Sequence, residues 1–94
     1  MSPSISGISF VPAPEHLTAS GLVGWVSFLI DDALRADGVG VRRTKHGRFV
    51  LSYPLREDAA GKPHYALRPI NTATRRLVEE RVLGELGFAT EEAS

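Results

Sequence analysis

The sequence predicts a small α+β domain in which an antiparallel β-sheet is covered by a C-terminal amphipathic α-helix. Short runs rich in β-branched and aromatic residues, separated by turn residues, fill most of 5–70. The segment that follows, 71–87, carries apolar residues at helical spacing. Several strands followed by one such helix favour a two-layer α+β arrangement. A length of 94 residues suits one domain, so we expect a single domain over 1–94 with an ordered core at about 5–87.

The first strands are predicted from alternating residues and from the residues that interrupt them. Residues 5–11 alternate in a short strand pattern with a weak point at Gly7. Residues 12–21 hold two prolines and a glycine, which predicts a loop. The most apolar run, 22–30, predicts a well-buried strand. Residues 33–43 predict a short strand or turn followed by another strand.

A hairpin and a final strand are predicted next. His46-Gly47 predicts a turn, and 48–53 predicts a strand with alternate side chains on one face. Pro54 ends that strand, because proline cannot donate to the sheet ladder. Residues 55–62 are polar and contain glycine, which predicts a mobile loop. Residues 63–70 predict a last short strand.

The C-terminal helix is predicted from its caps and its apolar stripe. Asn71 is the predicted N-cap, where an Asn side chain accepts a backbone N–H of the first turn. Gly87 suits the position just after the helix, which favours a left-handed conformation. The apolar stripe that would cover the sheet consists of Val78, Val82 and Leu86, flanked by Leu77 and Leu83.

Charge is divided unevenly along a chain whose net charge is zero. Residues 1–41 carry a net charge of −3 and 77–94 carry −4, whereas 42–76 carry +7. Such a split can mark a binding face. Lys and Arg on hairpins also solvate the edge of a sheet, and charge alone favours this second interpretation. The basic residues of the middle segment are Arg42, Arg43, Lys45, Arg48, Arg56, Lys62, Arg68, Arg75 and Arg76.

Arg75 and Arg76 lie in the first turn of the predicted helix, whose N-terminus ordinarily favours negative charge. A phosphate would suit this place, because free backbone N–H groups and arginines both bind anions. Glu79 and Glu80 follow at i+4, and each such pair contributes about 0.2–0.5 kcal/mol, against about 0.3–1 kcal/mol for the dipole. The structural and ligand-binding interpretations are therefore nearly balanced. Any anion site is expected at the tip of the helix, among Arg68, the free N–H groups and the two arginines.

Motifs for catalysis, metal binding or membrane insertion are weak. The chain has no cysteine, which excludes disulfides and thiolate metal sites and suits a cytoplasmic protein. No run approaches the about 20 apolar residues of a spanning helix, and no secretory signal is recognised. We therefore expect no enzyme activity, cofactor, metal or membrane association. The possible ligands are better explained as hairpin and turn residues, and they are His16, His46, His64, Asp31, Asp32 and Asp37.

Aromatic residues on the predicted strands have two interpretations. They suit base stacking in a nucleic-acid-binding protein, but aromatic residues at alternating strand positions more often belong to a core or a dimer interface. Their spacing does not separate the two possibilities. These residues are Trp25, Phe28, Phe49 and Tyr53.

Two motifs in the second half of the chain carry a family resemblance. The strand GRFVLSYP holds a Gly-x-Phe-Val pattern that ends in proline, and a polar loop with Gly61-Lys62 follows it. The helix start then reads Pro-Ile-Asn-x-x-Thr-Arg over 69–75. In this order the motifs resemble the stage V sporulation protein G (SpoVG, septation regulator) family, over about 5–86. The matching residues are Gly47, Phe49, Val50, Pro54, Pro69, Ile70, Asn71, Thr74 and Arg75.

The sequence departs from this family's usual pattern in two places. Members usually follow the proline with a serine and a Lys-Arg pair, whereas Leu55-Arg56-Glu57-Asp58 stands here. The usual histidine before Pro-Ile-Asn is Arg68. Glu57 and Asp58 therefore partly cancel the positive charge of the loop after Pro54, whereas Arg68 adds positive charge before the helix.

The resemblance implies a homodimeric regulator of septation or developmental gene expression, whose members bind DNA and in some cases RNA. It implies no catalysis and no cofactor. The leading hypothesis is a cytoplasmic regulator that contacts nucleic-acid phosphates. The alternative is a protein–protein interaction module of the division or developmental machinery, whose basic face docks an acidic partner. Under the leading hypothesis the main contacts are Arg68, Arg75 and Arg76, and the auxiliary contacts are Arg42, Arg43, Lys45, Arg48, Arg56 and Lys62.

Overall fold

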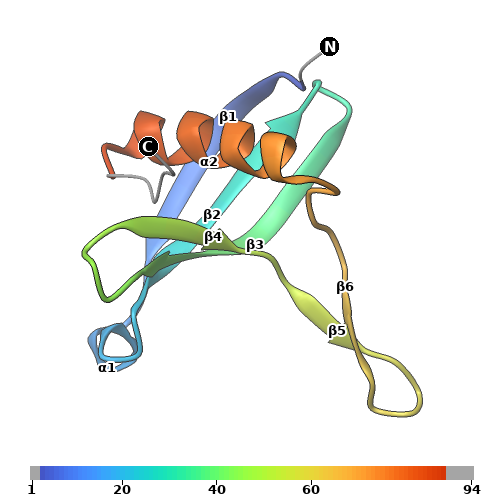
Figure 1. Ribbon diagram of the computed structural model, residues 1–94, viewed down its shortest axis with the longest axis horizontal. Coiled ribbons are helices and arrows are strands. Elements are labelled where there is room, and N and C mark those ends of the chain that lie inside the picture. The colour runs from blue at the N-terminus through green and yellow to red at the C-terminus, as the bar shows by residue number, and fades with distance from the viewer. Residues whose placement is uncertain (1–2, 89–94) are drawn as a thin grey trace.

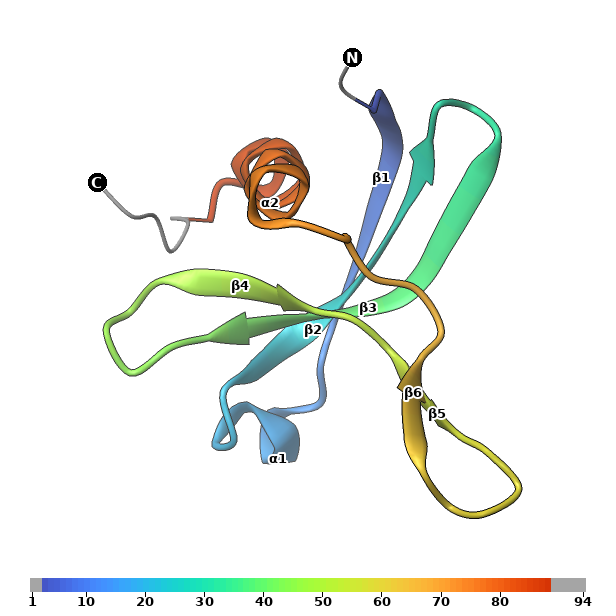
Figure 2. The same cartoon turned by 45° about the vertical axis from the view of Figure 1, so that its right-hand side comes forward.

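A computed structural model describes residues 3–88 and confirms the predicted α+β fold (Figure 1). Four antiparallel strands form one sheet in the order β1-β2-β3-β4, and β5 and β6 form a separate two-stranded sheet. Helix α2 lies across one face of the larger sheet (Figures 1 and 2). The elements are β1 (Ile5–Pro12), α1 (Glu15–Thr18), β2 (Leu22–Ile30), β3 (Leu34–Arg43), β4 (Phe49–Ser52), β5 (Leu55–Glu57), β6 (Pro63–Tyr65) and α2 (Thr72–Leu86).

The larger sheet is a meander in which strands adjacent in sequence are also paired in space. β2 pairs with both β1 and β3, which confirms the well-buried strand predicted for 22–30. The sequence left open whether residues 33–43 begin with a turn or with a short strand. In the structure, 34–43 form one continuous strand, β3. Its last four residues also pair with β4, from Gly40 opposite Ser52 to Arg43 opposite Phe49.

Tight turns join the strands where the sequence places turn residues. Asp31 and Asp32 both adopt a positive φ of 54°, and Asp31 Oδ1 accepts a 2.7 Å hydrogen bond from the backbone N–H of Ser4. These aspartates therefore act as turn formers. The turn between β3 and β4 closes with a 2.7 Å bond from the N–H of Thr44 to the carbonyl of Arg48.

At the β1 end of the sheet, one prediction is confirmed and another is incomplete. The predicted weak point at Gly7 is an irregularity in the β1–β2 register, and the glycine has a φ of 58°. The segment 12–21, predicted as a loop, contains the short helix α1. Pro14 precedes this single helical turn, and proline has no N–H to leave unsatisfied at a helix start.

The core lies between the larger sheet and α2. Alternate residues of β2, among them Val26 and Phe28, are buried, and so are Val78, Val82 and Leu83 of α2. Leu77 and Leu86 pack against this cluster but are only partly buried. The predicted apolar stripe is therefore correct in its centre and looser at its edges.

The caps of α2 are those that the sequence predicts. The side chain of Asn71 accepts a 2.8 Å hydrogen bond from the N–H of Thr74. Gly87 ends the helix in the left-handed region at a φ of 82°, and the N–H of Phe88 bonds to the carbonyl of Leu83 at 2.9 Å. This pattern satisfies carbonyls that the last turn would otherwise leave unpaired.

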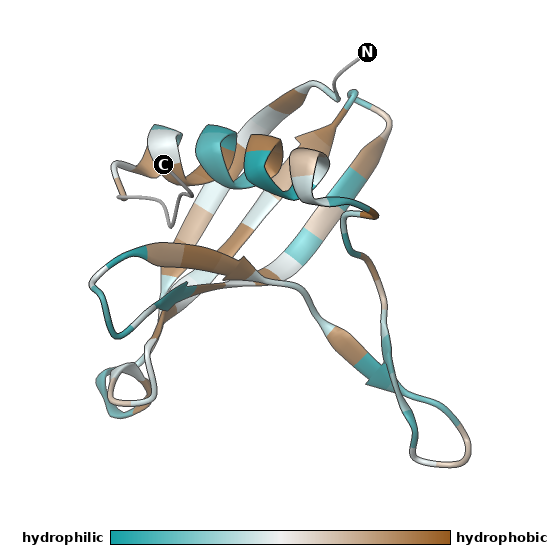
Figure 3. Ribbon diagram, viewed as in Figure 1, coloured by the Kyte–Doolittle hydropathy of each residue, from teal (hydrophilic) through white to brown (hydrophobic). Residues whose placement is uncertain are grey.

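Strands β5 and β6 form a hairpin, here called the arm (residues 55–65), that projects from the junction of the sheet and α2 (Figures 1 and 2). Two predictions are wrong in this region. The mobile loop predicted for 55–62 begins with a strand, and the strand predicted for 63–70 ends at Tyr65. The two halves pair with each other, from Leu55 opposite Tyr65 to Glu57 opposite Pro63. Figure 3 colours β4 as mostly hydrophobic, whereas much of the arm is hydrophilic.

Within residues 3–88, neither helix has the length and apolar character needed to cross a membrane.

Candidate nucleic-acid interface

All nine basic residues predicted as phosphate contacts are exposed, but they do not form one patch. Arg42, Arg68 and Arg75 line one surface groove of about 360 Å³. We call it the basic groove, and its full lining is Arg42, Val50, Leu51, Ser52, Tyr53, Tyr65, Arg68, Pro69 and Arg75. It lies where the edge of the sheet, the base of the arm and the start of α2 meet.

Three different elements bring these arginines together. Arg42 lies near the end of β3, opposite Val50 of β4, and its Nη1 donates a 3.4 Å hydrogen bond to the carbonyl of Ser20. Arg68 lies in the connection between β6 and α2, and Arg75 follows the Asn71 cap within α2. Their separation in sequence explains why charge counting alone did not select this set.

The remaining basic residues lie outside the basic groove. Arg43 and Lys45 line a different cavity of about 530 Å³, together with Phe49 and Phe88 near the C-terminal end of α2. Arg42 and Arg43 separate because successive residues of a strand point to opposite faces of the sheet. Arg48 lies in the β3–β4 hairpin, Arg56 and Lys62 lie in the arm, and Arg76 lies on α2.

Arg75 is held in the basic groove by a buried glutamate. Its Nη1 lies 3.3 Å from Glu79 Oε1, which confirms the predicted i, i+4 pair. Only 2% of Glu79 is exposed, and its Oε2 accepts a 3.1 Å hydrogen bond from the N–H of Leu51 in β4. The equivalent pair predicted between Arg76 and Glu80 is not among the ion pairs found within residues 3–88. Both residues are exposed, where ion pairing gains little over hydration.

Two tyrosines contribute aromatic surface to the basic groove. Tyr65 is 51% exposed, and the guanidinium carbon of Arg68 lies 5.3 Å from the centre of its ring. The hydroxyl of Tyr53 is buried and has no hydrogen-bond partner within residues 3–88. Burial, followed by the negative charge of Glu79, raises the pKa of Tyr53 to about 12, although Arg75 opposes the shift. Tyr53 is therefore a neutral phenol at physiological pH.

Sequence reasoning missed Tyr65 and named other aromatic residues instead. Phe28 is fully buried, and Phe49 packs against Phe88 with ring centres 4.6 Å apart. For these two residues the core interpretation is confirmed. The available signal for Tyr65 was its place between Lys62 and Arg68 in the basic segment.

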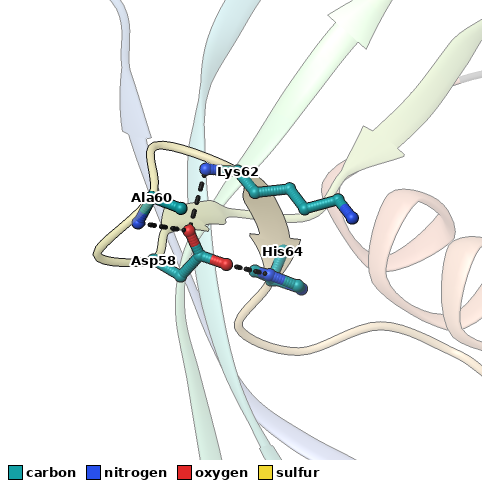
Figure 4. A network of polar contacts seen from close by, with 4 residues as sticks. All are labelled: Asp58, Ala60, Lys62 and His64. Atoms are coloured by element: carbon teal, nitrogen blue, oxygen red, sulfur yellow. Dashed lines mark hydrogen bonds and ion pairs between the residues drawn. The ribbon is translucent and has the colours of Figure 1, made fainter.

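The arm is organised by Asp58, which accepts three hydrogen bonds in Figure 4. Its Oδ1 accepts from the N–H groups of Ala60 and Lys62, both at 2.9 Å. Its Oδ2 lies 2.9 Å from His64 Nε2. The Lys62 bond, followed by the His64 bond, lowers the pKa of the Asp58 carboxyl. Asp58 thus joins the two strands of the arm across their turn.

We expect Asp58→Ala to open this turn while the larger sheet stays intact. The reason is that the Asp58 carboxylate accepts the hydrogen bonds from Ala60, Lys62 and His64, which alanine cannot replace. The lowered pKa means that this support is present above the ordinary Asp pKa of about 3.9 and is lost as pH falls through the folded value. Amide hydrogen exchange measured by NMR should accelerate at Ala60 and Lys62, while Leu51 stays protected. Unchanged exchange at the two arm amides would contradict the assignment.

A second groove, of about 470 Å³, lies beside the basic groove and is lined almost entirely by apolar atoms. We call it the apolar groove. Its rim includes Ile70, which is 90% exposed, and Leu34, which is 61% exposed. Tyr53, Arg68 and Pro69 line both grooves. Exposed apolar surface of this kind commonly marks an interaction site.

Within residues 3–88, no group of three or more His, Cys, Asp or Glu side chains is arranged to hold a metal ion. Among known proteins, no family model matches this chain and no curated protein matches it.

Proposed function

We propose that this protein is a cytoplasmic nucleic-acid-binding regulator of the septation or sporulation type, and that it is not an enzyme. The observation that supports the proposal best is the meeting of Arg42, Arg68 and Arg75 on one groove. Guanidinium groups bind phosphate oxygens through charge-assisted, often bidentate hydrogen bonds. The resemblance to the SpoVG family, carried by the motifs around Pro54 and Asn71, supports the same assignment.

The proposed ligand is DNA or RNA, contacted mainly through its phosphates. Such contacts release counterions, so the logarithm of the binding constant falls with the logarithm of salt concentration by about 0.9 per phosphate on duplex DNA. The test is a fluorescence anisotropy titration of the purified protein against labelled DNA and RNA at several salt concentrations. Absence of binding at low salt, or binding that does not depend on salt, would rule out the proposal.

We further propose that the regulator is a homodimer and that a second copy covers the apolar groove. A chain of 94 residues has little core with which to offset a large exposed apolar rim, and a two-fold interface pairs the same patch on both copies. Light scattering should give a dimer mass at micromolar concentration. Ile70→Lys should shift that mass towards the monomer, whereas Val11→Lys, also at an exposed apolar residue but outside the groove, should not. A monomer mass for the unaltered protein refutes the dimer.

A second candidate function is a protein–protein interaction module whose basic groove docks an acidic partner. The observation that favours it is the apolar groove beside the basic groove, because exposed apolar surface rimmed by polar residues commonly marks a protein interaction site. The two functions differ in a pulldown treated with nuclease. A partner bridged by nucleic acid is lost, whereas a directly docked protein is retained.

A further inference from the structure

Tyr65 presents an aromatic ring to solvent within a groove that is otherwise rich in arginine. The residue is 51% exposed, although burying an aromatic side chain ordinarily favours folding. Arg68 lies over the ring, with its guanidinium carbon 5.3 Å from the ring centre. Such a contact restrains both side chains. The ring is therefore held at the groove, and about half of the residue remains accessible.

The backbone around Tyr65 is also fixed. Tyr65 is the last residue of β6 and pairs with Leu55 of β5. The N–H of the next residue, Ala66, donates a 3.0 Å hydrogen bond to the carbonyl of Pro54, which directly precedes β5 and follows β4 by two residues. The ring thus lies at the anchored base of the arm, next to the edge strand of the sheet.

We propose that the basic groove takes a single-stranded nucleic acid, with one unstacked base against Tyr65 and Arg68 and the adjoining phosphates against Arg42 and Arg75. This inference rests on the proposed nucleic-acid-binding function and specifies the ligand of the same groove. A base within a duplex is stacked on both sides and cannot lie against a protein ring. Bases of single strands can stack on aromatic rings and on guanidinium planes.

The size and lining of the basic groove fit this ligand class. A volume of about 360 Å³ lies at the lower end of the range of about 300–1,000 Å³ for small-ligand sites, which suits one nucleotide rather than a duplex. Stacking tolerates every base, because each has a π-face. We therefore expect a preference for single strands with little sequence selectivity at the stacked position.

The experiment compares three labelled oligonucleotides of one sequence: single-stranded DNA, single-stranded RNA and the DNA duplex. Anisotropy titrations at one fixed salt concentration should show tighter binding of the single strands. Tyr65→Ala should weaken single-strand binding about 5- to 150-fold, the usual effect of losing one stacked base. Tyr65→Phe keeps the ring and should restore binding, and Tyr65→Ala should weaken duplex binding much less than single-strand binding, because a duplex offers no unstacked base to the ring.

A second measurement uses the unaltered protein and a strand that carries 2-aminopurine. Stacking of that base against the ring should change its fluorescence on binding. Equal affinity for single strands and duplex, or an unchanged 2-aminopurine signal in the bound strand, overturns the inference but leaves the proposed function standing. Single-strand binding that Tyr65→Ala does not weaken does the same. Absence of binding to all three oligonucleotides overturns both.

Discussion

Glu79→Met is expected to lower the free energy of unfolding by roughly 1–3 kcal/mol, the usual cost of leaving a buried hydrogen-bonding group without its partner. The group left behind is the N–H of Leu51, which donates to Glu79 Oε2 at 3.1 Å. Methionine matches glutamate in length and fills the same space, so the loss reports the hydrogen bond and the ion pair rather than a cavity. The Arg75 guanidinium is released at the same time, but Arg75 is 46% exposed and can be hydrated.

The matched control is Glu79→Gln, which retains a side-chain oxygen that can accept from Leu51 but removes the charge that pairs with Arg75. We expect the glutamine variant to be more stable than the methionine variant. Urea unfolding gives both free energies. In a domain of this size each kcal/mol corresponds to about 4–8 °C in the thermal midpoint. A methionine variant as stable as the glutamine variant would show that the Leu51 bond contributes little to docking α2.

The burial of Glu79 could not be predicted from the sequence, because it depends on contacts between segments that are far apart in the chain. The caps of α2 were predictable because Asn71 and Gly87 act on backbone groups within their own turns. The sequence predicts Glu79 as the i, i+4 partner of Arg75, and this is correct for one of its two oxygens. The other oxygen is bound to a strand residue 28 positions away, and that proximity depends on how the helix crosses the sheet.

In the arm, the turn could be predicted from local residues, whereas the two strands could not. Its strands are short, and β5 was hidden in a polar segment that predicts a loop. The turn at Asp58 is a local signal, because an Asp carboxylate often binds backbone N–H groups two residues on. The bond to Ala60 is of this kind. Residues 63–70 divide between β6 and the connection to α2 because only Pro63–Tyr65 has a strand partner in β5.

The candidate interface was predictable in composition but not in arrangement. All nine basic residues are exposed, as a charged segment of +7 suggests, and Arg68 and Arg75 were correctly placed near the helix start. Their grouping with Arg42 depends on the pairing of β3 with β4, which puts Arg42 opposite Val50 and turns Arg43 to the other face. The alternation along a strand was visible, but the meeting of Arg42 with Arg68 and Arg75 in one groove was not.

Replacing Arg42 and Arg68 together by alanine is expected to weaken binding of duplex DNA by roughly 60-fold at 0.1 M salt, if each arginine neutralises one phosphate. The slope of the logarithm of affinity against the logarithm of salt should become shallower by about 1.8 for the duplex and by about 0.7 for a single strand, where Arg68 lies against a base and only Arg42 contacts a phosphate. Arg42 and Arg68 suit this test better than Arg75. Because Arg75 pairs with the buried Glu79, its replacement would affect folding as well as binding. Neither Arg42 nor Arg68 belongs to an ion pair within residues 3–88.

The matched control replaces Arg35 and Arg81, which are also exposed but do not line the basic groove. Arg35 lies on β3 opposite Leu29, and Arg81 lies on α2. Both double variants lose two positive charges, so any general attraction of the protein for a polyanion falls equally in the two. A larger loss in the groove variant therefore measures local phosphate contacts. Equal losses would mean that binding follows net charge alone, and the basic groove would then have no special part in it.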